Sequence, residues 1–184
     1  MAEKDYFDSY ESKLVEELLR LCTSAGMLDG VLLQSEDIDR KWDEFAPEYM
    51  ADALHEIAAY PEVAIAWAGY LGMAVAEYWD LDWAGHSRDN YESFHGSRGF
   101  DNMDDHIMED VLGHRLGSAA AKKITHMMET CAQCCISYIR HEQIEPQTVA
   151  AYHVFVRTVK SMYRIGEAMQ LKMKGYKFEK VNLK

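Results

Sequence analysis

Three carboxylates stand where an apolar helix is predicted to end. Glu77, Asp80 and Asp82 follow a nearly uncharged run that extends from Val63 to Ala76. The C-terminal end of a helix carries partial negative charge, so acidic side chains are unfavourable there. Glu77 would also lie on a buried helix, where an unpaired carboxylate is costly. Because local rules are most often broken at functional sites, we predict a site for a metal or a small ligand at this helix end.

The next segment, residues 80–100, adds further groups that could bind a ligand. It has three glycines and no helical period, and ordered loops of this length tend to be functional. Its basic and imidazole side chains are His86, Arg88, His95 and Arg98. Two interpretations remain open. The histidines and acids bind a metal or a small ligand, or Arg88 and Arg98 neutralise Glu77 and Asp80 in an internal salt-bridge network.

A second candidate set has four-residue spacing. His106, Asp110 and His114 would lie on one side of a continuous helix, where side chains at this spacing can act together as metal ligands. The same side carries three small residues, Gly113, Gly117 and Ala121. Small residues allow another element to approach closely, so the set faces either solvent or a cleft.

A cysteine cluster is the third candidate. Cys131, Cys134 and Cys135 could supply three thiolates to a metal. On a helix they share a face with apolar residues such as Met127 and Met128, and free cysteine is a common core residue. The pattern therefore favours core packing over a metal or redox site.

Helical periodicity predicts the elements that position these residues. Apolar residues recur at three- and four-residue steps through most of the chain, and no β-strand pattern is visible. Pro47 is expected to kink or divide the second helix. Helices are predicted at residues 4–25, 36–57, 61–79, 101–113, 119–141 and 146–171.

The helix at about 61–79 is apolar on all sides, as is typical of a helix buried at the centre of a domain. The fold class predicted is therefore all-α, a single-domain bundle of five to seven helices around this central helix. The domain is expected to cover residues 1–174, followed by a basic C-terminal tail at 175–184.

Charge is distributed unevenly along the chain. Residues 1–110 contain 26 acidic and 7 basic side chains, whereas residues 157–184 contain 2 and 8. An acidic body repels phosphate backbones, which argues against nucleic acid as a partner. The basic tail is expected to lie on the acidic half of the protein or to be solvated. The longest nearly apolar stretch has about 14 residues, too few to span a membrane.

The expected address is the cytoplasm, because no signal-peptide pattern is visible and the cysteines do not form a secreted disulfide framework. Tyr and Met, 11 of each, are enriched in interface cores. With the charge asymmetry, they favour a non-catalytic interaction or scaffold domain that self-associates. The alternative is a metal- or small-ligand-binding protein, or an enzyme, with its site at residues 77–106. The sequence identifies no cofactor and does not decide whether the protein is an enzyme.

Overall fold

The computed structural model describes residues 2–57 and 60–181, and these are mostly helical. They contain a 3-10 turn, η1 (Phe100–Asn102), and a π-helical turn, η2 (Ile107–Val111). The seven α-helices are α1 (Ala2–Ser24), α2 (Glu36–Ile57), α3 (Pro61–His86), α4 (Glu92–His95), α5 (Met103–His106), α6 (Ala119–His141) and α7 (Val149–Met173). Within these ranges there is no β-strand, and the predicted all-α bundle is confirmed.

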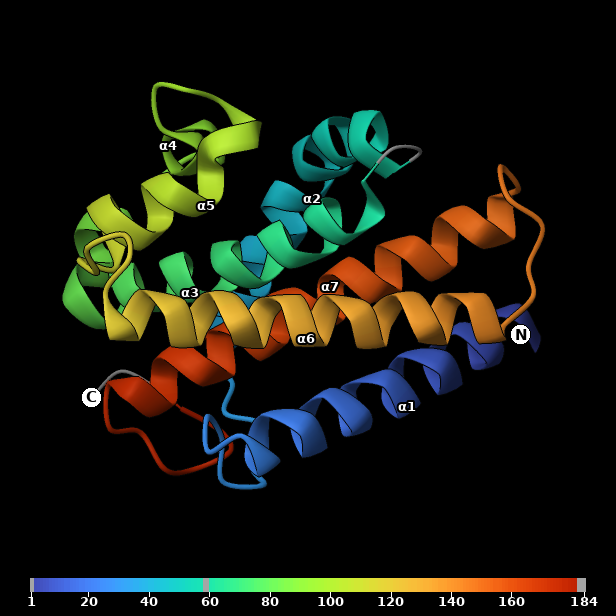
Figure 1. Cartoon of the computed structure of the whole chain (residues 1–184), viewed down its shortest axis with the longest axis horizontal. Helices are drawn as coiled ribbons and strands as arrows, with labels where there is room; N and C mark the ends of the chain where they lie inside the picture. The colour runs from blue at the N-terminus through green and yellow to red at the C-terminus, as the bar shows by residue number, and fades with distance from the viewer. Residues whose placement is uncertain (1, 58–59, 182–184) are drawn as a thin grey trace.

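Helix α3 lies at the centre of the bundle and packs against α2, α6 and α7 (Figure 1). Its crossing with α7 is a contact between backbones. A Cβ atom added to Gly166 would lie 1.9 Å from the carbonyl oxygen of Gly69, and one added to Gly72 would lie 2.0 Å from that of Tyr163. Only glycine permits this approach. The predicted central position of the 61–79 helix is confirmed.

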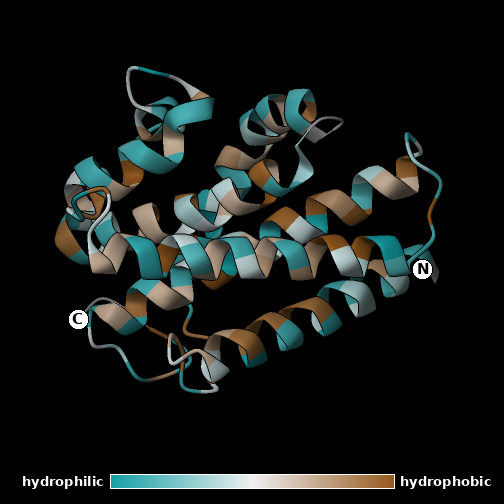
Figure 2. Cartoon of the chain, in the orientation of Figure 1, coloured by the Kyte–Doolittle hydropathy of each residue, from teal (hydrophilic) through white to brown (hydrophobic). Residues whose placement is uncertain are grey.

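The other helices turn their apolar residues toward α3 and α7. Along α1, α6 and α7, hydrophobic and hydrophilic residues alternate at a helical period (Figure 2). Cys22, Cys131 and Cys135 lie fully buried in the core, with Cys22 Sγ 3.6 Å from Cys131 Sγ. The hydrogen bond with Cys22 and burial raise the pKa of the Cys131 thiol, so this thiol is neutral. No helix in the described part of the chain is long and apolar enough to cross a membrane.

Two helix boundaries follow side-chain caps. Ser118 Oγ accepts a hydrogen bond from the Ala121 N–H at 3.2 Å, which starts α6 where the sequence predicts it. Thr148 Oγ1 accepts one from the Ala151 N–H at 3.1 Å, so α7 begins after Thr148 rather than at Pro146.

Two helices differ from the prediction, one in continuity and one in length. Helix α2 runs unbroken through Pro47, which is exposed, because Phe45 and Tyr49 on either side are buried and hold the helix together. Helix α3 continues to His86 instead of ending near residue 79. Its backbone breaks at Asp82 (φ −165°, ψ 83°), whose Oδ1 accepts a hydrogen bond from the Gly85 N–H at 3.1 Å and starts a further turn.

The segment between α3 and α5 is anchored to the core rather than free. Tyr91 and Phe94 are buried, and Trp67 Nε1 donates a hydrogen bond to the Phe100 carbonyl oxygen at 2.9 Å. Part of the predicted 80–100 loop is helical, in the last turn of α3 and in α4. The irregular stretches of this segment are therefore short.

The chain beyond α7 lies on the acidic half of the protein. The Val181 N–H donates to the Gln34 carbonyl at 2.8 Å, and the Gln34 N–H donates to the Glu179 carbonyl at 2.9 Å. Lys172 Nζ pairs with Asp29 at 3.0 Å. Residues 174–181 thus form part of the packed body over the range that the structure describes.

Candidate functional site

The first predicted carboxylates are bound by side chains from the end of α7 and the residues after it. Glu77 Oε2 accepts a hydrogen bond from Gln170 Nε2 at 2.7 Å and pairs with Lys174 Nζ at 2.8 Å. Asp80 Oδ1 accepts a hydrogen bond from the Tyr176 hydroxyl at 2.7 Å. Helix α7 runs beside α3, so its C-terminal end supplies these partners. These contacts of Glu77 and Asp80 connect the end of α7 and the residues after it to the central helix α3.

The partners expected for these acids lie elsewhere. Arg88 and Arg98 are exposed and form no ion pair with Glu77 or Asp80. The reason is the break in α3 at Asp82, after which the chain leaves the α7 side of the helix. Glu77 is ion-paired, but with Lys174 in place of the arginines that the salt-bridge interpretation names.

We expect Glu77→Gln to lower the free energy of unfolding by about 1–2 kcal/mol, because it removes the charged partner of Lys174 at a mostly buried position. Urea denaturation measures this change. In a double-mutant cycle with Lys174→Met, the two losses should be less than additive. A coupling energy near zero would contradict a structural role for this pair.

Three of the four predicted histidines each lie beside one carboxylate. These pairs are His86 Nδ1 with Asp89 Oδ2 at 2.7 Å, His95 Nε2 with Asp52 Oδ2 at 3.0 Å, and His106 Nδ1 with Asp110 Oδ2 at 2.9 Å. His114 does not join His106 and Asp110 on one helix face, because the helix ends at Val111 and Gly113 has a φ of 74°. In the described ranges, no three His, Cys, Asp or Glu side chains are placed to hold a metal ion.

A cleft does open beside the small residues Gly117 and Ala121. It has a volume of about 360 Å³ and lies between α6 and the α5–η2 segment. Its acidic lining comes from Asp104, Asp105 and Glu129. Burial, and next the charge of Asp105, raises the pKa of Asp104 to about 6. The small residues thus mark a cleft, but His106, Asp110 and His114 do not line it.

A group of polar and charged side chains from two helices lies between α2 and α7. A cavity of about 180 Å³ opens there. Side chains at helical three- and four-residue spacing line it from both helices, and the preceding loop adds one more. They are Asp39, Trp42 and Asp43 of α2, Lys160, Tyr163 and Arg164 of α7, and Gln34 of the loop.

One carboxyl group in the cavity lining, that of Asp39, has a buried carboxyl group behind it. Asp39 lines the cavity, and Glu167, which is 0% exposed, lies within hydrogen-bonding distance of it. Glu167 Oε2 accepts a hydrogen bond from the Ser35 N–H at 2.9 Å. Burial, and next the contact with Asp39, raises the pKa of Glu167 well above its ordinary value. The raised pKa favours the protonated form of Glu167, which has an O–H group to donate toward Asp39.

This wall has unused hydrogen-bonding capacity. Among the described residues, no N–H or hydroxyl group donates to the buried atoms Glu167 Oε1 or Asp39 Oδ1, and Ser35 Oγ has no partner. Buried polar atoms without such partners are few in folded proteins, and each calls for an explanation. A proton on Glu167 that bonds Asp39 would satisfy the two carboxyl oxygens, while Ser35 Oγ would still lack a partner.

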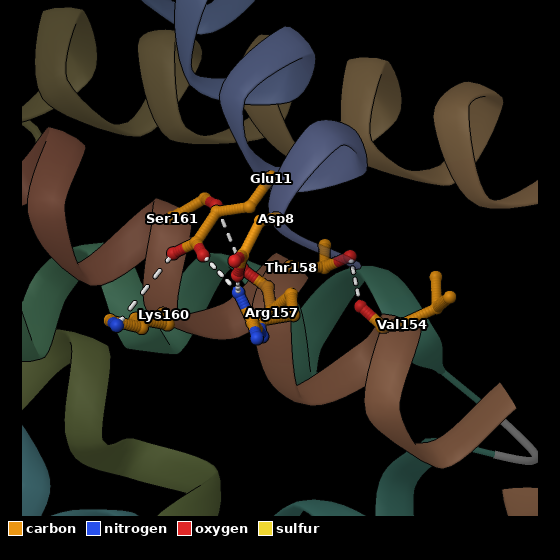
Figure 3. A network of polar contacts seen from close by, with 7 residues as sticks. All are labelled: Asp8, Glu11, Val154, Arg157, Thr158, Lys160 and Ser161. Atoms are coloured by element: carbon orange, nitrogen blue, oxygen red, sulfur yellow. Dashed lines mark hydrogen bonds and ion pairs between the residues drawn. The ribbon is translucent and has the colours of Figure 1, made fainter. Parts of the chain in front are cut away.

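The opposite wall carries positive charge. About one turn before Lys160 on α7, Arg157 Nη1 already donates to two carboxylates, at 2.7 Å from both Asp8 Oδ1 and Glu11 Oε2 (Figure 3). Lys160 Nζ lies 3.8 Å from Glu11 Oε1, a weaker contact. Arg164 Nη2 donates to Gln34 Oε1 at 3.2 Å. Lys160 and Arg164 thus keep donors for an anionic group in the cavity.

Glu167 was within reach of sequence reasoning. It lies on the apolar stripe of the last helix, with the buried Tyr163, Ala168 and Leu171 near it. Glu167, like Glu77, is a carboxylate on a helix face that the sequence predicts to be buried. Its contact with Asp39 could not be predicted, because 128 positions separate the two residues.

The chain matches no family model, no curated protein and no solved structure. Its architecture and the α2–α7 cavity are therefore the basis for considering its function.

Proposed function

We propose that this protein binds a small polar organic molecule in the α2–α7 cavity. The observation that carries the proposal is the carboxylate of Asp39 in the cavity lining, with the buried Glu167 beside it. Perturbed carboxyl pairs in clefts are typical of functional sites. We therefore assign the proposed ligand to the space between α2 and α7 rather than to residues 77–106.

The dimensions and lining of the cavity support a ligand of few atoms. Its volume of about 180 Å³ is below the range of roughly 300–1,000 Å³ that is usual for drug-sized ligands. Trp42 and Tyr163 give it an aromatic floor, with ring centroids 5.1 Å apart. Around this floor stand groups of both charges. An apolar base with a few convergent polar groups is the usual form of a small-molecule site.

Thermal unfolding in the presence of a library of small amines, carboxylates, amino acids and sugars tests this proposal. A ligand of the native state should raise the melting temperature. Asp39→Asn and the cavity-filling Asp43→Trp should abolish the shift. Glu48→Gln, on the exposed face of α2 outside the cavity, should retain it. If no compound shifts the parent at 10 mM, or if the shifts survive both cavity variants, the proposal is wrong.

The interaction-domain interpretation is a second candidate, and one observation favours it. A cleft of about 620 Å³ lies between α1 and α6, and three tyrosines, Tyr6, Tyr10 and Tyr138, contribute to its walls. Tyrosine is enriched at the centres of protein interfaces. If this cleft mediates self-association, sedimentation velocity should show a dimer that Tyr6→Ser and Tyr138→Ser convert to monomer. A monomeric parent at 100 μM would contradict self-association.

A further inference from the structure

Opposite charges face each other across the α2–α7 cavity. Asp39 and Asp43 stand one helical turn apart on α2, and Lys160 and Arg164 stand one turn apart on α7. All four side chains line the same space of about 180 Å³. A ligand of a few heavy atoms would therefore contact both pairs at once.

A ligand with a single charge would match only one of these pairs. An anion would leave Asp39 and Asp43 without a cationic partner, and a cation would leave the free N–H groups of Arg164 without an acceptor. A zwitterion satisfies both pairs. The planar guanidinium of Arg164 suits two parallel hydrogen bonds to a carboxylate. The Trp42 ring beside Asp39 and Asp43 adds a favourable surface for an ammonium group.

We propose that the ligand is a small α-amino acid, with its ammonium group at Asp39 and Asp43 and its carboxylate at Lys160 and Arg164. This inference rests on the proposed function, because it names the ligand class of the same cavity. The carboxylates of Asp39 and Asp43, which line the cavity, receive the ammonium N–H groups. The aromatic floor of Trp42 and Tyr163 contacts a short side chain.

Three probes test the inference, namely L-alanine and two analogues that each lack one of its charged groups, ethylamine and propionate. Isothermal titration calorimetry of the full chain should show alanine binding at least tenfold more tightly than either of the others. Asp43→Asn, a change at an exposed residue, should weaken alanine binding to about the level of propionate. Arg164→Met should weaken it to about the level of ethylamine. Arg164→Lys, which keeps the charge but not the planar fork, should fall between parent and Arg164→Met.

The outcomes of these measurements distinguish the ligand-class inference from the proposed function. If ethylamine or propionate binds as tightly as alanine, the zwitterion inference is wrong, while ligand binding by the cavity stands. If all three probes fail but library compounds bind in an Asp39-dependent way, the ligand class is again wrong and the site is supported. If neither the probes nor the library bind, both proposals fail. If the parent binds alanine and Glu48→Gln binds it equally well, while Asp43→Asn loses the preference over propionate, the inference is supported.

Discussion

Alanine in place of Gly166 is expected to destabilise the protein by about 3 kcal/mol or more, enough to leave part of the protein unfolded at 37 °C. The added Cβ would lie 1.9 Å from the Gly69 carbonyl oxygen, and this neighbour is helix backbone that cannot rotate away. Helices α3 and α7 would have to separate, and overpacking of this kind usually costs 1–3 kcal/mol or more. Urea denaturation followed by circular dichroism measures the loss.

Gly69→Ala is the matched control, because it makes the same substitution on the partner helix at the same crossing. There the added Cβ would lie 2.5 Å from Met128 Sδ, which belongs to a flexible side chain. We expect a loss of less than about 1 kcal/mol, since the higher helix propensity of alanine offsets part of the repacking cost. Equal losses for Gly69→Ala and Gly166→Ala would show that backbone contact does not set the crossing.

Glu167→Gln is expected to stabilise the protein at neutral pH. The pKa of Glu167 is raised in the folded state above its ordinary value of 4.5, so the folded protein binds the proton more tightly than the unfolded chain does. Stability from this group is therefore complete below pH 4.5 and is lost as the pH rises through the folded-state pKa. Glutamine has no such loss, accepts from the Ser35 N–H and can donate to Asp39.

The pH dependence distinguishes this cause from a general gain in packing. The difference in unfolding free energy between Glu167→Gln and the parent should be near zero at pH 4 and should grow toward neutral pH, by about 1.4 kcal/mol per unit of pKa elevation. Asp43→Asn, on the rim of the same cavity, should show no such growth because Asp43 is exposed. A constant offset at all pH values would contradict a protonated Glu167 in the native state.

A stabilising Glu167→Gln variant would also bear on function. A carboxyl group that weakens the fold at neutral pH while lying beside a cavity is the pattern expected when stability is traded for a binding or catalytic group. Ligand binding should then be weaker in this variant than in the parent, because an amide replaces the titratable carboxyl group beside Asp39. Structural groups such as Glu77, which pairs with Lys174, should show the opposite sign of stability change.

The sequence by itself determined the elements that depend on local chemistry. The apolar run at 61–79 marks a central helix, because a helix without a polar face has to be enclosed on all sides. Ser118 marks the start of α6 because its cap bonds a backbone N–H only three residues away. The cysteine face of α6 follows from helical periodicity alone, with Cys131 and Cys135 buried in the core.

Tertiary structure decided the pairings, because partners distant in sequence leave no local signal. Glu77 is neutralised by Lys174 rather than by Arg88 or Arg98, since α7 runs beside α3 while the break at Asp82 directs the following segment away. Pro47 stays inside a helix because buried neighbours outweigh its lost hydrogen bond. Asp39 meets Glu167 only because α2 and α7 pack together. A carboxyl group on an apolar stripe can be recognised from sequence, but whether it meets a lysine or a second acid depends on which helix lies against it.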